Sequence, residues 1–286
     1  MEASDLKNNL LSHFKKVLVY LKWNIDDDFK TMVSKSHFLV KFKYLKKTFI
    51  FRYARFSEKQ IQRQVIAYDL LKSFAPKIYY FDDFCLIEEY IKGEVFTLKT
   101  KNDLWQKLGL LLAEIHENKG FGFGLLTTSK KSKYSNLIDS MKIYFNNFSL
   151  IYEQNILSKK EISKLESFLF NPPKSSDNSS KICHGDFWLQ NIIYSEKALK
   201  IQLIDWEHIL SNYREYDFVP FCRLEDERAI EITKILKKSY GHDLNQDLIN
   251  YFIIIRTVSR YIHHRENKQK IDKLNYDLLR YRKYFS

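Results

Sequence analysis

Apolar and polar residues follow two different periods along this chain, and the period changes near residue 93. Residues 5–23 place apolar side chains at helical spacing and predict an amphipathic helix. Residues 57–73 predict a second helix, which Ser57 can cap. Four short runs alternate with the period of two that is typical of strands, and they predict two antiparallel pairs: residues 38–44 with 48–53, and residues 77–81 with 84–90. This part of the chain therefore predicts a small β-rich lobe with one helix between its strand pairs.

The spacing becomes mainly helical beyond Gly93, which is the first glycine of the chain and a natural place for a boundary. The pattern predicts a helix at residues 102–116, two more helices within residues 136–170, and a mostly helical segment from residue 225 to the end. We therefore expect an α+β protein with two domains, residues 1–92 and residues 93–286.

Composition is compatible with a folded protein that has a substantial core. Of the 286 residues, 45% are hydrophobic and 16% are aromatic, which argues against disorder. No apolar run is long enough to cross a bilayer, and the first residues do not resemble a signal peptide, so we expect no membrane span. The three cysteines are widely spaced and odd in number, which suits a reducing compartment. The expected location is cytoplasmic.

The formal net charge of +12 is concentrated in two segments. Residues 35–63 contribute +8 and residues 256–283 contribute +6. Basic segments of this kind can bind nucleic acid or anionic lipid, but more often they form a solvated face. Because no nucleic-acid-binding motif accompanies them, we expect no nucleic-acid partner.

The most informative segment is His184-Gly-Asp-Phe-Trp-Leu-Gln-Asn191, which is followed by Leu203-Ile-Asp205-Trp-Glu207. Residues 181–183 predict a short buried strand that leads into a loop with Asp186. Residues 192–194 and 201–204 predict a hairpin that returns Asp205 toward Asn191 and Asp186.

These three side chains suit the transfer of a phosphoryl group. Asp186 can accept a proton from an alcohol, and Asn191 and Asp205 offer the hard oxygen ligands that Mg²⁺ prefers. Turn formation would explain any one of the three residues, but not all three at this spacing.

This segment resembles the aminoglycoside phosphotransferase and choline/ethanolamine kinase superfamily, whose members are relatives of protein kinases. The resemblance covers nearly the whole chain and implies a bilobal protein-kinase-like fold with a small β-rich N-lobe and a larger, mainly helical C-lobe. It implies Asp186 as the catalytic base and Asn191 and Asp205 as ligands of Mg²⁺, with ATP or GTP as the co-substrate. His184 would have a structural role in the catalytic loop, and Asp217 would buttress the site.

The small lobe resembles the same families in outline. Arg52 falls where they have a cation that reaches the nucleotide phosphates, and backbone groups at Glu89 and Ile91 would pair with the purine. The expected glycine-containing loop is replaced by residues 34–37, so phosphate contacts would come from ordinary backbone, from the hydroxyl groups of Ser34 and Ser36, or from Lys35.

A further departure concerns the anion that pairs with Arg52. The helix glutamate of these families appears here as the neutral Gln64, and Glu58 is a possible substitute. Both losses put the affinity for nucleotide in question.

The acceptor is less well defined than the reaction. An acid two residues after Asp205, together with the following residues up to Asp217, is similar to choline and ethanolamine kinases, so an amino alcohol is favoured. Glu207 is the first candidate for contact with its amine, and Asp217 is a second candidate substrate residue. However, residues 251–261 lack the tryptophan pair of a choline cage and include Arg256. Gly185 also stands where choline kinases usually have Asn.

We therefore expect a Mg²⁺-dependent kinase that acts on a hydroxyl group of a small molecule. An aminoglycoside, another sugar or a small metabolite stays open as the acceptor. A catalytically weak kinase-like scaffold and a metal-dependent hydrolase are the alternatives from other classes.

Overall fold

The computed structural model describes residues 3–25, 29–33, 37–55, 57–127, 131–142, 144, 148–175, 177–195, 199–264 and 266–285, with the backbone alone for residues 3–9. The chain forms two compact units. The first unit contains Met1–Phe96 and Leu189–His208, and the second contains Thr97–Trp188 and Ile209–Ser286.

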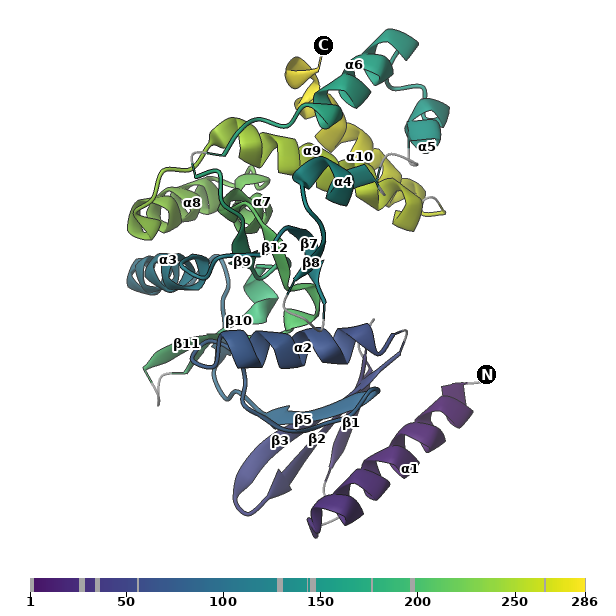
Figure 1. Cartoon of the computed structure of the whole chain (residues 1–286), viewed down its shortest axis with the longest axis vertical. Coiled ribbons are helices and arrows are strands. Elements are labelled where there is room, and N and C mark those ends of the chain that lie inside the picture. Colours follow the sequence, from purple (N-terminus) through teal and green to yellow (C-terminus); the bar gives the residue numbers. More distant parts are fainter. Residues whose placement is uncertain are drawn as a thin grey trace. The chain divides into compact units, whose positions relative to one another are not determined.

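The first unit is built on a five-stranded antiparallel sheet with the order β1-β2-β3-β5-β4. Figure 1 shows helices α1 and α2 on opposite faces of this sheet. A second, three-stranded sheet has the order β11-β10-β6. The elements of the unit are α1 (Ala3–Leu21), β1 (Lys30–Val33), β2 (His37–Tyr44), β3 (Lys47–Ala54), α2 (Lys59–Leu70), β4 (Ile78–Phe81), β5 (Cys85–Glu89), β6 (Glu94–Val95), the 3₁₀ turn η2 (Leu189–Asn191), β10 (Ile192–Ser195), β11 (Lys200–Leu203) and the 3₁₀ turn η3 (Trp206–His208).

An aromatic core joins α1 to the five-stranded sheet. Phe14 of α1 is fully buried, and its ring lies 5.1 Å from Phe42 and 5.0 Å from Phe51. Burial of such rings is the main stabilising contribution here, since aromatic side chains remove a large apolar area from water. The periodic apolar positions of the predicted opening helix thus form its buried face, and that helix prediction is confirmed.

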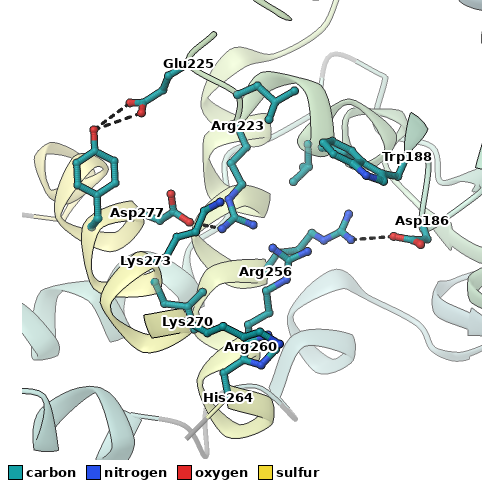
Figure 2. A pocket seen from close by; sticks show the side chains of 15 residues that line it. Asp186, Trp188, Arg223, Glu225, Arg256, Arg260, His264, Lys270, Lys273 and Asp277 are labelled. Carbon is teal, nitrogen blue, oxygen red and sulfur yellow. Dashed lines mark hydrogen bonds and ion pairs between the residues drawn. The ribbon is translucent and has the colours of Figure 1, made fainter. Parts of the chain in front are cut away.

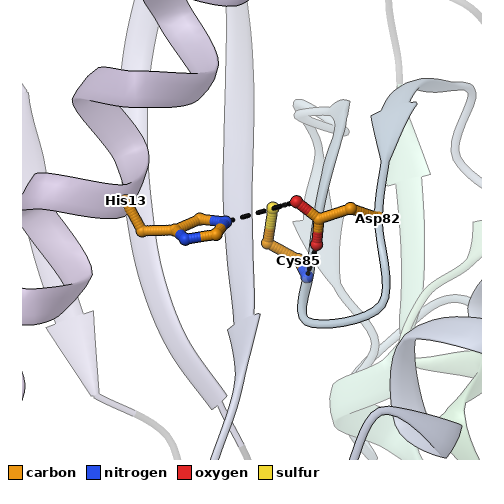
Figure 3. Close-up of side chains that lie close together, drawn as sticks. All are labelled: His13, Asp82 and Cys85. Carbon is orange, nitrogen blue, oxygen red and sulfur yellow. Dashed lines mark hydrogen bonds and ion pairs between the residues drawn. The ribbon is translucent and has the colours of Figure 1, made fainter.

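A second attachment of α1 to the unit is polar (Figure 3). Asp82, in the turn between β4 and β5, accepts a hydrogen bond of 3.2 Å from Nε2 of His13 on α1. The same carboxylate accepts bonds from the amides of Phe84 and Cys85, 2.8 Å each, and from the thiol of Cys85. Burial alone would raise the pKa of Asp82, but these hydrogen bonds outweigh it and hold the pKa below its ordinary value. The ionised carboxylate therefore connects α1 to the sheet.

The second unit is mainly helical, with a four-stranded antiparallel sheet in the order β8-β7-β12-β9. Its largest helix, α9, is buried along most of its length, and Trp105 of α3 packs edge-to-face against Phe221 at 5.7 Å. The elements are α3 (Asn102–His116), β7 (Phe123–Leu126), β8 (Ser132–Tyr134), α4 (Leu137–Met141), α5 (Phe148–Glu153), α6 (Lys159–Phe170), β9 (Lys181–Cys183), β12 (Leu210–Asn212), the 3₁₀ turn η4 (Arg214–Phe218), α7 (Val219–Cys222), α8 (Glu227–Tyr240), α9 (Gln246–His264), α10 (Lys268–Arg280) and the 3₁₀ turn η5 (Arg282–Tyr284).

The predicted α+β class is confirmed, as are both strand pairs of the β-rich lobe and the helix at residues 102–116. The prediction of two helices within residues 136–170 is wrong, because the described part of that stretch contains the three helices α4, α5 and α6. Strands β1, β6, β7, β8 and β12 were not predicted, since runs of two to four residues are too short to establish a period. Within the described residues, no helix combines the length and apolar character needed to cross a bilayer.

Candidate active site

Arg52 is the centre of a buried ion-pair network in the first unit. Its Nε and Nη2 donate to Oε1 of Glu88 at 3.2 and 2.8 Å, and its Nη1 donates to Oδ1 of Asp205 at 3.1 Å. Burial alone would lower the pKa of Arg52, but the two carboxylates outweigh it and raise the pKa above its ordinary value. The guanidinium is therefore a fixed positive charge next to the predicted metal ligand Asp205.

Strand register explains why Glu88 is the partner. Arg52 of β3 pairs with Leu86 of β5, and Glu88 lies two positions further along β5, on the same face of the sheet. Among the described residues, Glu88 takes this role in place of Gln64, which the alignment put there, and of Glu58, the possible substitute. Glu88 could have been recognised from the sequence as a candidate partner for a buried cation, because it is a charged residue at the end of an otherwise buried apolar run.

Gln64 of α2 supports the other partner of Arg52. It is 3% exposed, its side-chain oxygen accepts a 3.1 Å bond from the amide of Trp206, and its side-chain nitrogen lies 3.4 Å from Oδ1 of Asp205. The neutral amide can both donate and accept, whereas a glutamate here would place a second negative charge against Asp205. Gln64 thus orients the backbone and the carboxylate at this turn.

Asn191 and Asp205 lie at the same end of the β10–β11 hairpin. Ile192 pairs with Leu203, and the amide of Ile204 donates to the carbonyl oxygen of Asn191 at 2.9 Å, which confirms the predicted hairpin. Asp205 has a φ of +65°, a left-handed conformation that costs free energy for a residue with a side chain. Its side chain stays 31% exposed, so solvent can reach a carboxylate that the local backbone holds in an unusual position.

Glu207 is buried beside His37 in the first unit. It is 5% exposed, and its Oε2 accepts a 2.7 Å bond from Gln60 and lies 3.7 Å from Nε2 of His37. Burial, and then the nearby Arg52, lower the pKa of His37 to about 3, so its ring is neutral at pH 7. Glu207 therefore connects α2 to the turn after β11, and its contact with an amine stays a prediction.

The other predicted nucleotide contacts are the backbone groups at Glu89 and Ile91 and the side chains of Ser34 and Ser36. The amide of Glu89 donates to the carbonyl of Lys77 at 2.8 Å, so this group is already in use within the sheet. Ile91 is 7% exposed, and its backbone makes no hydrogen bond with the residues that the structure describes. Ser34 and Ser36 lie outside the described residues.

Asp217 fixes the predicted catalytic loop in the second unit. Its two oxygens accept bonds from the amides of His184 and Gly185 at 2.7 and 2.9 Å, and Nε2 of His116 lies 3.2 Å away. Burial alone would raise the pKa of Asp217, but these partners outweigh it and lower the pKa below its ordinary value. Asp217 is 1% exposed and supports the loop backbone, and its contact with substrate stays a prediction.

The backbone of the loop also accounts for Gly185. Its φ of +84° lies in the left-handed region, which glycine adopts without strain and asparagine tolerates better than most other residues. Glycine and asparagine can therefore both adopt the backbone conformation of residue 185. For this reason, the presence of Gly185 where choline kinases usually have Asn carries no information about the acceptor. His184 is fully buried, and its Nδ1 accepts a 3.3 Å bond from the amide of Asp186, which agrees with a structural role.

Asp186 opens onto a cavity of about 490 Å³ in the second unit (Figure 2). Its side chain is 42% exposed, and Oδ1 lies 3.5 Å from Nη2 of Arg256 on α9. Trp188 also lines the cavity, together with residues of α7, α9 and α10. A carboxylate that is reachable from a cavity of this size is well suited to receive a proton from a small molecule.

Three solved structures illustrate what the fold resembles. The choline kinase LicA from Streptococcus pneumoniae superposes with a TM-score of 0.66 at 15% identity, over 97% of this chain and 99% of that chain. A thermostable mutant of aminoglycoside phosphotransferase APH(4)-Ia, in ternary complex with ADP and hygromycin B, gives 0.66 at 11% identity, over 94% and 97%. Macrolide 2′-phosphotransferase MphH from Brachybacterium faecium gives 0.62 at 9% identity, over 96% and 97%. None of the curated proteins matches the chain by sequence.

The fold is thus that of the kinase-like small-molecule phosphotransferases, as the sequence predicted. The family is established separately by sequence: the choline/ethanolamine kinase model matches residues 29–285. The chain belongs to the choline/ethanolamine kinase family, and it is a phosphotransferase that acts on an alcohol group. Helix α1 precedes the matched region.

Proposed function

We propose that this protein is a Mg²⁺-dependent kinase that transfers the γ-phosphoryl group of ATP or GTP to a hydroxyl group of a small molecule. The observation that carries the proposal is the buried network of Arg52, Glu88 and Asp205. It combines a cation for phosphate oxygens with a carboxylate for a metal, and both are held by several partners before any ligand arrives. Such preorganisation is the main contribution that a protein makes to phosphoryl transfer.

The first unit supplies the nucleotide contacts in this proposal. Arg52 neutralises charge on the phosphates, and the amide of Ile91 is the donor for the purine. Glu89 contributes through its carbonyl oxygen, because its amide is engaged with Lys77. A fold neighbour that was solved with ADP supports a nucleotide co-substrate.

The donor set of Asn191 and Asp205 fits Mg²⁺. Both side chains present hard oxygen atoms from the same end of one hairpin, and Mg²⁺ in kinases takes one or two such protein ligands in addition to phosphate oxygens and water. The partly exposed carboxylate of Asp205 is accessible to an ion. Bound there, the ion would neutralise charge on the phosphates.

Asp186 is the catalytic base in the second unit. As the acceptor oxygen attacks the γ-phosphorus, the bond from phosphorus to the β–γ bridging oxygen breaks, and the hydroxyl proton passes to the carboxylate of Asp186. Asp217 keeps the loop in position, so that Asp186 faces the cavity. The products are the nucleoside diphosphate and the phosphate ester of the acceptor.

Two substitutions test this assignment. Asp186→Asn should abolish phosphoryl transfer, measured as nucleoside diphosphate formation, while nucleotide binding measured by calorimetry stays close to that of the wild type. Asp205→Asn should remove the increase in nucleotide affinity that Mg²⁺ produces. The control is Asp83→Asn, which makes the same chemical change at an exposed position of the first unit and should alter neither readout. Wild-type turnover of Asp186→Asn would show that Asp186 is not the base.

A further inference from the structure

The cavity beside Asp186 has an excess of positive charge. Five cationic side chains line it, and only three acidic ones do: Arg223, Arg256, Arg260, Lys270 and Lys273 against Asp186, Glu225 and Asp277. Figure 2 shows the arginines at 256 and 260 on α9 and the two lysines on the neighbouring helix α10. Four of the five cations therefore come from two adjacent helices and face one space.

Two of the three acids are already neutralised. Asp277, 4% exposed, forms an ion pair with Arg223. Glu225 pairs with Arg280 at 3.1 Å, and it also accepts a bond from the hydroxyl of Tyr276. The third acid is the proposed catalytic base. None of the three thus offers an uncommitted negative charge to an acceptor that carries an amine.

Three of the remaining cations have no such partner, and the fourth, Arg256, contacts only the proposed catalytic base Asp186 among the acids that line the cavity. Arg260, Lys270 and Lys273 form no ion pair with any residue that the structure describes. Nη1 of Arg256 is buried and makes no hydrogen bond within the described part of the chain. Burying a donor without an acceptor is unfavourable, so this nitrogen is suited to an oxygen atom of a ligand.

Among the described residues, two aromatic side chains line the cavity, Trp188 and Tyr276, and the hydroxyl of Tyr276 donates to Glu225 at 3.3 Å. The ring of Tyr216 is covered by the guanidinium of Arg256, 5.4 Å from its centroid. The tryptophan that lines the cavity, Trp188, packs against Phe221 at 6.1 Å. An ammonium group placed here would meet several positive charges and little aromatic surface to offset them.

On the basis of the proposed function, we infer that the acceptor is an anionic alcohol: a hydroxyl compound that also carries a phosphate ester or a carboxylate. Its hydroxyl group lies at Asp186, and its anionic group binds among Arg260, Lys270 and Lys273. The reaction joins the γ-phosphoryl group to the hydroxyl oxygen and releases the nucleoside diphosphate and one proton. The product carries a second anionic group, in contrast to the product from choline or ethanolamine.

Four acceptors that share a three-carbon skeleton test the charge preference: glycerol, glycerol 3-phosphate, glycerate and 3-amino-1,2-propanediol. With ATP and Mg²⁺ saturating, kcat/KM for the better of the two anions should exceed that for the amine by at least about tenfold, the ratio that corresponds to one hydrogen bond to a charged group. Comparison of kcat/KM for glycerol 3-phosphate with that for glycerate shows whether the site prefers a phosphate ester or a carboxylate. A higher kcat/KM for the amine, or for choline added as a fifth acceptor, would overturn the inference.

Charge reversal on α10 locates the anionic group. Lys273→Glu and Lys270→Glu should each lower kcat/KM for the preferred anion by about tenfold, and they should lower kcat/KM for uncharged glycerol by a clearly smaller factor. Lys268→Glu is the matched control, because Lys268 is exposed on the same helix and does not line the cavity. Equal losses in all three variants would indicate an effect of net charge and contradict the assignment.

Binding separates a failure of this inference from a failure of the proposed function. Calorimetry with glycerol 3-phosphate, glycerate and 3-amino-1,2-propanediol, each in the presence of a non-hydrolysable ATP analogue, needs no turnover. Binding of either anion that Lys273→Glu weakens and Lys268→Glu does not would support the anionic site even if no acceptor reacts, in which case the proposed kinase activity fails alone. No binding of either anion, or tighter binding of the amine, would reject the anionic site.

Discussion

Replacement of Asp217 by asparagine is the sharpest test of how the catalytic loop is supported. The carboxylate accepts bonds from the amides of His184 and Gly185 and lies within hydrogen-bond distance of His116. Asparagine keeps one acceptor oxygen and turns an NH₂ group toward one of the two amides, so one buried N–H loses its partner.

The magnitude follows from these contacts. A hydrogen bond to a charged group contributes about 1.5–3 kcal/mol, and a buried donor left without an acceptor costs about 1–3 kcal/mol. We therefore expect Asp217→Asn to lower the free energy of unfolding by about 3 kcal/mol. With a urea m-value of about 3 kcal/mol/M, the unfolding midpoint should fall by about 1 M. Asp272→Asn, the same change at an exposed position of α10, should stay within about 0.5 kcal/mol of the wild type.

The pH dependence provides an independent check. Because the pKa of Asp217 is lower in the folded protein than its ordinary value of 3.8, its ionised form stabilises the fold above that value. This contribution should be lost as the pH falls through the folded-state pKa, so the wild type and Asp217→Asn should converge at acidic pH. Equal urea midpoints for the two proteins at pH 7 would refute the reasoning about the loop.

The remaining predictions concern the Arg52 network, the glycine of the loop and the attachment of α1. Glu88→Gln should lower the free energy of unfolding by about 2 kcal/mol and weaken nucleotide binding in calorimetry, because it removes one of the two anions that hold the buried guanidinium. Gly185→Asn should be at least about 1 kcal/mol more stable in urea than Gly185→Val, since a β-branched residue does not fit the left-handed backbone; the reverse order would contradict this account. His13→Ala should increase amide hydrogen exchange in α1, whereas Lys15→Ala, exposed on the same helix, should not.

The sequence by itself determined the reaction class, because the residues that carry it lie close together in the chain. Asp186, Asn191 and Asp205 fall within two short segments, and the hairpin that connects Asn191 to Asp205 is formed by local alternation of apolar residues. Short-range patterns of this kind are read directly from the order of residues, since neighbouring strands leave few ways to pair. The family resemblance followed from the same segments, and the α+β class followed from the strand and helix periods on either side of Gly93.

Only the tertiary structure decided which charges meet. The partner of Arg52 depends on the register between β3 and β5, and a shift of one residue would have turned Glu88 to the opposite face. The buried positions of Glu207 and Asp217, and the positive charge that α9 and α10 turn toward Asp186, depend on how distant helices and turns pack. The period of a helix predicts that it has an apolar face, but not which charged side chains of two helices will face the same cavity. For that reason the sequence favoured an amino alcohol, whereas the charges that line the cavity lead us to propose an anionic one.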